Sequence, residues 1–140
     1  MEDSELIESL NHFFKVSGRC SLKIYKELEM SELTIKQIEQ LKVIRDHKSI
    51  THSELVEITN LSKPTVTEMI NKFIKNGCVV KEKSPTDKRS YYVKLTDRGL
   101  KIAKSNELSL EKLIQKMLSS LTEDEIKTFI KLVKKIPLTE

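Results

Sequence analysis

Apolar residues recur at helical spacing over most of the chain. From residue 4 to about residue 29 they line one face, which predicts a single long amphipathic helix. A second helix is expected to end near His47. It begins after Thr34, because Thr34 and Gln37 have the spacing of a capping box, in which each side chain accepts the backbone N–H of the other residue. The pattern therefore predicts a mainly α-helical protein.

A short third helix is expected after a second capping-box pattern, formed by Thr51 and Glu54. Residues 48–50, which precede it, are interpreted as a plain connector. Within this helix the apolar spacing predicts that Leu55 and Ile58 face the core.

A fourth helix follows a turn and begins after Ser62, a favourable N-cap, with Pro64 tolerated in the first turn. Asn76 and Gly77 form a typical C-terminal stop. One stripe of this helix is apolar and must be buried against the preceding helix: Val66, Met69, Ile70 and Phe73. Two helices joined by a short turn in this way predict a helix-turn-helix.

The period then changes from 3.6 to 2. Residues 78–83 and 91–95 are rich in β-branched and aromatic residues, and a charged segment with one proline lies between them, which predicts a β-hairpin. Thr96 is expected to cap a final helical region that restarts near Thr122, where Glu125 completes another capping box. The fold class is therefore mainly α with a small β-hairpin wing.

The order of elements predicts one domain over residues 1–140, with a winged helix-turn-helix at 33–99. Its helical ends, 4–29 and 100–137, carry apolar stripes that exceed what one short helix pair can cover. Burying such stripes between two chains forms an intermolecular bundle, so a homodimer is expected. In helix-turn-helix proteins that bind DNA, the second helix of the motif enters the major groove. A two-fold dimer presents two such helices about 34 Å apart, which predicts a palindromic DNA site, or operator.

Composition narrows the class of partner. The chain is 38% hydrophobic and 33% charged, with a net charge of +4, as expected for a soluble globular protein. Residues 51–99 contain nine Lys or Arg and six Asp or Glu, a difference of +3. Most of the net charge therefore lies in the predicted winged helix-turn-helix, which favours a polyanion such as double-stranded DNA.

The fourth helix and the hairpin tip supply the candidate DNA contacts. Short hydroxyls near a helix N-terminus can reach phosphates or base edges, and Asn can read adenine. Asp87 can hold the Arg89 guanidinium by a charge-assisted pair, and an Arg held in this way can enter a narrow minor groove. The plainer alternative is an ordinary surface helix with a solvated turn pair. The candidates are Ser62, Lys63, Pro64, Thr65, Thr67, Asn71, Lys72, Lys88 and Arg89.

Six short segments between residues 33 and 100 occur in continuous register. Together they resemble the pattern of the MarR (multiple antibiotic resistance regulator) family of winged helix-turn-helix transcription regulators, whose dimer region the helical ends also fit. The resemblance implies a dimeric repressor, or less often an activator, with Arg89 in the minor groove. It also implies a small-molecule pocket or a reactive cysteine between the dimer helices and the DNA-binding part. The segments are Leu33–Gln37, Glu54–Leu55, Ser62–Thr67, Asn76–Gly77, Pro85–Arg89 and Leu95–Gly99.

Three positions depart from the family pattern. Glu68 stands where an Arg is frequent; a carboxylate is repelled by phosphates, although it can accept a hydrogen bond from cytosine. Lys81 replaces an Arg and keeps the charge without the guanidinium fork. Cys78 replaces a Leu and is interpreted as a small core residue.

Other chemistry is sparse. Cys20 lies on the apolar stripe of the first helix and is either an oxidation sensor or a buried small hydrophobe. His12, His47 and His52 lack metal-ligand spacing, so neither a metal nor a cofactor is expected. The N-terminus has no signal-peptide pattern, and no apolar run is long enough to span a membrane. We therefore expect a cytoplasmic protein.

Three classes of function compete. The favoured one is a sequence-specific DNA-binding transcription regulator, a repressor whose binding a small apolar or aromatic ligand relieves. A winged helix that only binds proteins tends to have a neutral or acidic wing, whereas this wing is basic. An enzyme is not expected, because the sequence has no nucleophile–base set, glycine-rich phosphate loop or metal motif.

Overall fold

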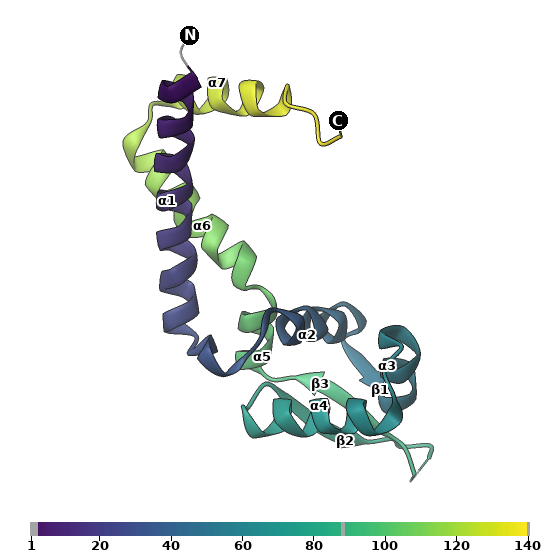
Figure 1. Ribbon diagram of the computed structural model, residues 1–140. Helices are drawn as coiled ribbons and strands as arrows, with labels where there is room; N and C mark the ends of the chain where they lie inside the picture. The colour runs from purple at the N-terminus through teal and green to yellow at the C-terminus, as the bar shows by residue number, and fades with distance from the viewer. Residues whose placement is uncertain (1–2, 88, 140) are drawn as a thin grey trace. The chain divides into compact units, whose positions relative to one another are not determined.

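A computed structural model describes residues 3–87 and 89–139. Residue contacts divide the chain into two compact units, one formed by residues 25–105 and the other by residues 1–24 and 106–140. Helices dominate both units, and the strands all belong to residues 25–105 (Figure 1). The prediction of a mainly α-helical protein with a small β wing is confirmed.

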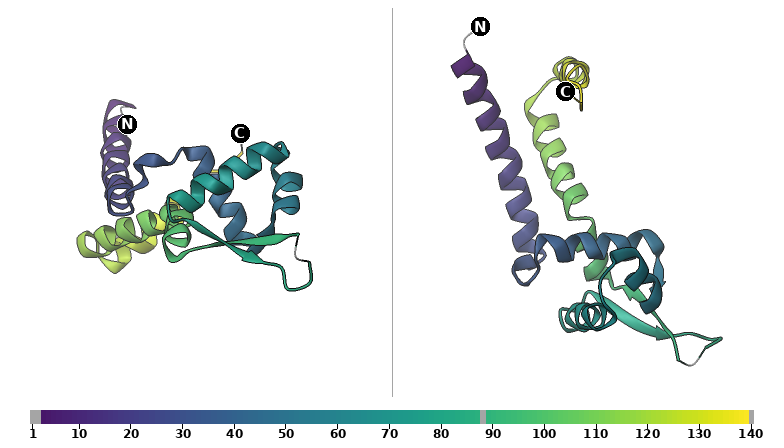
Figure 2. Two further views of the ribbon diagram at one scale, coloured as in Figure 1. Left: turned by 90° about the horizontal axis from the view of Figure 1, so that it is seen from below. Right: turned by 45° about the vertical axis from the view of Figure 1, so that its right-hand side comes forward.

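The unit of residues 25–105 contains the winged helix-turn-helix. Its helices are η1 (Met30–Glu32), α2 (Ile35–His47), α3 (His52–Thr59), α4 (Lys63–Lys75) and α5 (Asp97–Ala103). Its strands are β1 (Ser49–Thr51), β2 (Val79–Lys83) and β3 (Tyr91–Leu95). The strands form an antiparallel sheet in the order β1-β3-β2 (Figure 2).

Strand β1 corrects one prediction. The segment interpreted as a plain connector pairs with β3, with Ile50 opposite Val93. Both side chains are fully buried. A strand of three residues is too short to show a period, and its pairing partner lies more than forty residues away, so the sequence pattern could not reveal it.

The predicted N-caps are present. Thr34 and Gln37 form a complete capping box, with bonds of 3.1 and 2.9 Å. Thr51 accepts the backbone N–H of Glu54, but the Glu54 carboxylate accepts the Thr51 hydroxyl and not its backbone N–H. Ser62 caps α4 by accepting the Thr65 N–H, which fixes where this helix begins.

The core of this unit is built from α2, α3, α4, α5 and the sheet. The predicted α4 stripe of Val66, Met69, Ile70 and Phe73 is buried. Ile58 was wrongly expected in the core, since its side chain is 45% exposed. The less exposed positions of α3 are 52, 55, 56 and 59, and Ile58 lies on the other side of Leu55 from this arc.

Arg98 links segments of this unit that are far apart in the sequence, a role that the sequence did not suggest. Its guanidinium donates to the carbonyl oxygens of Leu28 at 2.6 Å, Glu29 at 3.1 Å and Asn76 at 3.1 Å. Asn76 is the C-cap residue of α4. Arg98 therefore holds the end of the fourth helix against the segment that precedes η1.

The second unit is formed mainly by α1 (Asp3–Glu27), α6 (Ser105–Ser120) and α7 (Glu123–Lys134). The rings of Phe13 on α1 and Phe129 on α7 lie 6.0 Å apart between centroids. The final helical region is interrupted at Leu121–Thr122 as predicted, and it is also interrupted at Lys104. In the described part of the chain, no helix is both long and apolar enough to cross a membrane.

Candidate nucleic-acid interface

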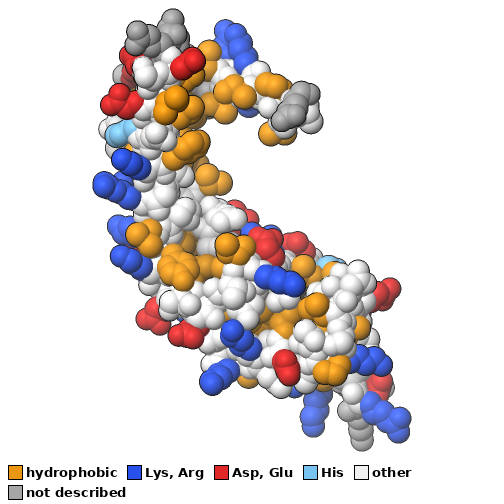
Figure 3. Space-filling model, in the orientation of Figure 1, with side chains coloured by type: hydrophobic (Ala, Val, Ile, Leu, Met, Phe, Trp, Pro, Cys, Tyr) orange, Lys and Arg blue, Asp and Glu red, His pale blue; other side chains and the backbone are white. Residues whose placement is uncertain are grey.

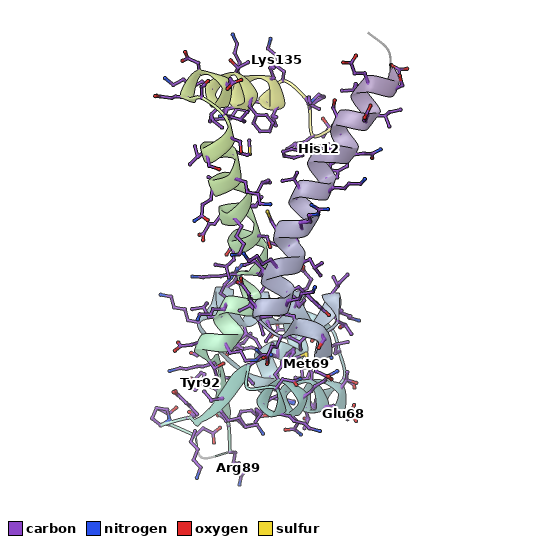
Figure 4. All side chains as sticks on the ribbon, turned by 90° about the vertical axis from the view of Figure 1, so that its left-hand side faces the viewer. His12, Glu68, Met69, Arg89, Tyr92 and Lys135 are labelled. Atoms are coloured by element: carbon purple, nitrogen blue, oxygen red, sulfur yellow. The ribbon has the colours of Figure 1, made fainter. Side chains whose placement is uncertain are left out.

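The residues predicted to contact DNA lie on the exposed side of α4 and at the wing tip. Seven of the candidates belong to α4 or its N-cap, and all seven are exposed: Ser62, Lys63, Pro64, Thr65, Thr67, Asn71 and Lys72. Glu68, which departs from the family pattern, is also an exposed residue of α4 (Figure 4). The buried stripe thus orients the polar face of the helix toward solvent.

The hydroxyls at the start of α4 are already engaged with each other. Ser62 Oγ accepts the Thr65 N–H at 3.2 Å and lies 2.7 Å from Thr65 Oγ1. One of the two hydroxyl protons makes the bond between them, so the other remains available to an outside acceptor. The α4 N-terminus also attracts anions through its unsatisfied N–H groups.

The wing tip is a turn held by its own side chains. Ser84 is 8% exposed, and its hydroxyl accepts the backbone N–H of Asp87 at 3.2 Å. Asp87 Oδ1 in turn accepts the backbone N–H of Arg89 at 2.9 Å. This carboxylate was expected to hold the Arg89 guanidinium, whereas its bond in the structure fixes the backbone that carries the Arg89 side chain.

Arg89 is exposed at the outer end of the wing (Figure 4). Figure 3 shows Lys and Arg side chains projecting around this end of the molecule. Lys88, the other predicted contact at the tip, lies outside the described residues. Lys94, farther along the hairpin, is paired with Glu82 at 2.8 Å, so its charge is partly neutralised.

A cluster that joins α3, α4 and the strands of the wing was not expected from the sequence. His52 Nε2 lies 2.9 Å from Thr67 Oγ1, which links α3 to the candidate face of α4. The His52 ring also meets the Tyr91 ring edge-on, with centroids 6.2 Å apart. Lys81 Nζ lies 4.6 Å from the centre of the Tyr91 ring, a cation–π contact. No sequence signal could have found it, because His52, Thr67 and Tyr91 come from separate elements.

The two cysteines are both buried. Burial raises the pKa of the Cys78 thiol, and the neighbouring Arg98 guanidinium offsets part of that rise. Since the thiolate is the reactive form, Cys78 is disfavoured as a nucleophile and fits the predicted small core residue. For Cys20, the choice between an oxidation sensor and a buried small hydrophobe stays untested, although its side chain is buried. Among the described residues, no group of three or more His, Cys, Asp or Glu is placed to hold a metal ion.

The helix-turn-helix of α3 and α4, followed by the β2–β3 hairpin, defines a winged helix-turn-helix protein. The model of the MarR family matches residues 33–91. The multiple antibiotic resistance protein MarR of Escherichia coli K12 is 32% identical over 106 residues, which are 75% of this chain and 74% of that protein. The transcriptional regulator HosA of Escherichia coli O111:H- is 31% identical over 108 residues, 77% of this chain and 80% of HosA. The chain belongs to the MarR family of transcriptional regulators.

Solved structures agree with this assignment. A cysteine-to-serine variant of MarR from E. coli, crystallised in complex with operator DNA, is 29% identical with a TM-score of 0.54 and covers 95% of this chain and 96% of that chain. The YusO protein of Bacillus subtilis shares the fold, with a TM-score of 0.64, 22% identity and coverage of 94% of this chain and 92% of YusO.

Proposed function

We propose that the protein is a sequence-specific repressor that binds a palindromic operator as a homodimer. The observation that carries the proposal is the exposed polar face of α4 beside a wing whose tip presents Arg89. The similar MarR of E. coli was crystallised with operator DNA, which supports placing α4 in the major groove and Arg89 in the minor groove.

The side chains divide into two kinds of contact. Lys63, Lys72 and Lys88 supply charge for phosphates, and the remaining hydroxyl proton of Ser62 or Thr65 supplies one donor beside the α4 N-terminus. Asn71 has the amide that reads adenine in the major groove. Pro64 has neither a backbone N–H nor a polar side chain, so it can add contact area with DNA but donates no hydrogen bond.

The homodimer is supported by the exposed apolar residues of the second unit. A soluble monomer rarely leaves so many large apolar side chains in contact with water. They occur on all three of its long helices, and they include Ile7, Phe14, Leu110, Ile114, Leu118 and Leu132, between 51% and 63% exposed. A second copy of the chain is the partner that buries them.

The proposal also includes relief of repression by a small-molecule ligand. A groove of about 370 Å³ in the second unit is lined largely by apolar side chains, among them Phe13, Val16, Leu113, Met117 and Phe129. Its size falls in the range of small-molecule sites. A small apolar or aromatic ligand is proposed to alter the spacing of the two DNA-binding parts; unchanged operator affinity across a panel of such ligands would contradict it.

Binding to genomic fragments, including the promoter of its own gene, over a salt series tests the DNA-binding proposal. We expect nanomolar binding to a specific fragment, a steep loss with salt, and a loss of 10-fold or more in affinity in Arg89→Ala, on the order of 1–3 kcal/mol per base contact. Arg19→Ala is the matched control, because it removes the same exposed charge from α1. A reporter driven by the bound promoter then shows whether binding represses.

The competing outcome is also informative. Weak binding that is independent of DNA sequence and equal in wild type, Arg89→Ala and Arg19→Ala would contradict the regulator proposal for this surface. The basic wing would then serve a protein partner.

A further inference from the structure

Thr67 differs from the other hydroxyl residues of α4 in how its hydroxyl is used. Its Oγ1 donates to the carbonyl oxygen of Lys63, one turn earlier, at 3.0 Å. The same oxygen lies 2.9 Å from His52 Nε2. If the Thr67 hydroxyl proton is donated to the Lys63 carbonyl, the protonated Nε2 of His52 donates to a lone pair of Thr67 Oγ1. In the other imidazole tautomer, Nε2 carries no proton and accepts the Thr67 hydroxyl proton. In either case the only hydroxyl proton of Thr67 is used within the protein.

The side chain of Thr67 nevertheless remains exposed. Because its proton is engaged with internal acceptors, the hydroxyl cannot donate to a phosphate or a base, and at most a lone pair remains to accept from DNA. The apolar group left to contact DNA is the γ-methyl. A threonine methyl in the major groove makes an apolar contact with the C5-methyl of thymine, a group that no other base carries.

We propose that Thr67 recognises thymine through its methyl group, and that His52 is the positioning residue that holds it in this orientation. This inference rests on the proposed DNA-binding function and assigns the kind of base that one position of α4 reads. It also changes the contact expected from the sequence, where the Thr67 hydroxyl was a candidate for phosphates and base edges.

His52 is itself held in place. It is the first residue of α3, it is half-buried, and its ring rests edge-on against Tyr91 of β3. Tyr91 is covered in turn by the Lys81 ammonium of β2. The orientation of Thr67 therefore depends on the first helix of the helix-turn-helix and on the strands of the wing. His52 couples the wing to the base-reading face of α4.

The experiment uses a duplex selected by the wild-type protein from a random-sequence pool. Each thymidine of that duplex is replaced in turn by 2′-deoxyuridine, which keeps the pairing edge and lacks only the C5-methyl. We expect one symmetry-related pair of positions at which the replacement weakens wild-type binding about four-fold per methyl, from the transfer free energy of one methylene-sized group.

Variants of Thr67 separate the methyl from the hydroxyl. Thr67→Val keeps a methyl, and because a helical valine is held in one dominant rotamer without a bond from His52, it should retain the preference for thymidine. Thr67→Ser keeps the hydroxyl and should lose the preference. Thr65→Ser removes a methyl from a neighbouring α4 position and is the matched control, expected to leave the preference at that position unchanged. Thermal unfolding of each variant checks that the fold is intact.

Variants of His52 test positioning. His52→Ala should reduce the ratio of thymidine to deoxyuridine affinity toward one, and His52→Gln, whose amide nitrogen can donate from nearly the same place, should restore it. The proposal is overturned if no thymidine preference depends on Thr67, or if Thr67→Val weakens binding to both duplexes while Thr67→Ser does not. Failure of the wild type to select any duplex would instead overturn the DNA-binding proposal itself.

Discussion

Gly99, near the start of α5, lies directly against the backbone of Cys78. The Thr96 N–H donates to the Cys78 carbonyl oxygen at 2.9 Å, which draws the start of α5 onto the beginning of the wing. A Cβ on Gly99 would collide with the Cys78 carbonyl group, which is backbone and cannot move aside as a side chain can. Glycine is therefore required here by space and not by its conformational freedom.

Gly99→Ala should lower the free energy of unfolding by about 3 kcal/mol or more, in the range of severe packing changes. Gly18→Ala is the contrasting substitution, because nothing lies within 4 Å of a Cβ built on this residue inside α1. It should raise the stability by about 0.5–1 kcal/mol through helix propensity. Urea denaturation at one fixed protein concentration measures both. Similar effects of the two substitutions would contradict the close approach at Gly99.

At the scale of elements, helix ends are determined by short-range hydrogen bonds. Thr122 begins α7 with a complete capping box, in which the Glu125 carboxylate accepts the Thr122 backbone N–H at 2.8 Å. This bond to the ionised form lowers the pKa of Glu125, and the Thr122 hydroxyl adds to the effect. A carboxyl whose folded pKa is depressed contributes stability above its unfolded pKa and loses that contribution as the pH falls through the folded value.

The backbone amide of Thr122 should report this titration. We expect its NMR chemical shift to follow the ionisation of Glu125, with a midpoint below that of the same carboxyl in the urea-unfolded chain. In Glu125→Gln the amide oxygen still accepts the N–H, so the cap should persist while this titration disappears. A midpoint equal to the unfolded value would show that the capping bond does not form.

For the whole molecule, the question is what covers the apolar side chains of α1, α6 and α7. Leu118 on α6 is 61% exposed within a single chain. Because a carboxylate cannot be buried in an apolar interface without a large cost, Leu118→Glu should convert a dimer into a monomer. Light scattering at micromolar concentration should give the mass of two chains for the wild type and of one chain for the variant.

Ile35→Glu provides the control for this change. Ile35 is 81% exposed but lies on α2, outside the helices proposed to form the interface. This variant should keep the mass of two chains and an unchanged circular dichroism spectrum. A wild-type protein that is already monomeric would contradict the homodimer and, with it, the expectation of a palindromic operator.

Features that depend on near neighbours along the chain could be predicted before the fold was known. Capping residues bond across three positions, as at Thr34, Ser62 and Thr122. The buried stripe of α4 follows from the helical period, and the strand period placed the wing between Gly77 and Thr96. These signals recur at fixed spacing, so the winged helix-turn-helix and its exposed candidate face could be predicted.

Contacts between residues far apart in the sequence became visible only in the folded chain. The pairing of β1 with β3, the three carbonyl groups held by Arg98, and the bond from His52 to Thr67 span between 15 and 70 residues. Such contacts have no period, because their geometry depends on how complete elements pack. For the same reason the sequence could nominate Thr67 for DNA contact, but only packing against α3 determined which of its groups is free to make it.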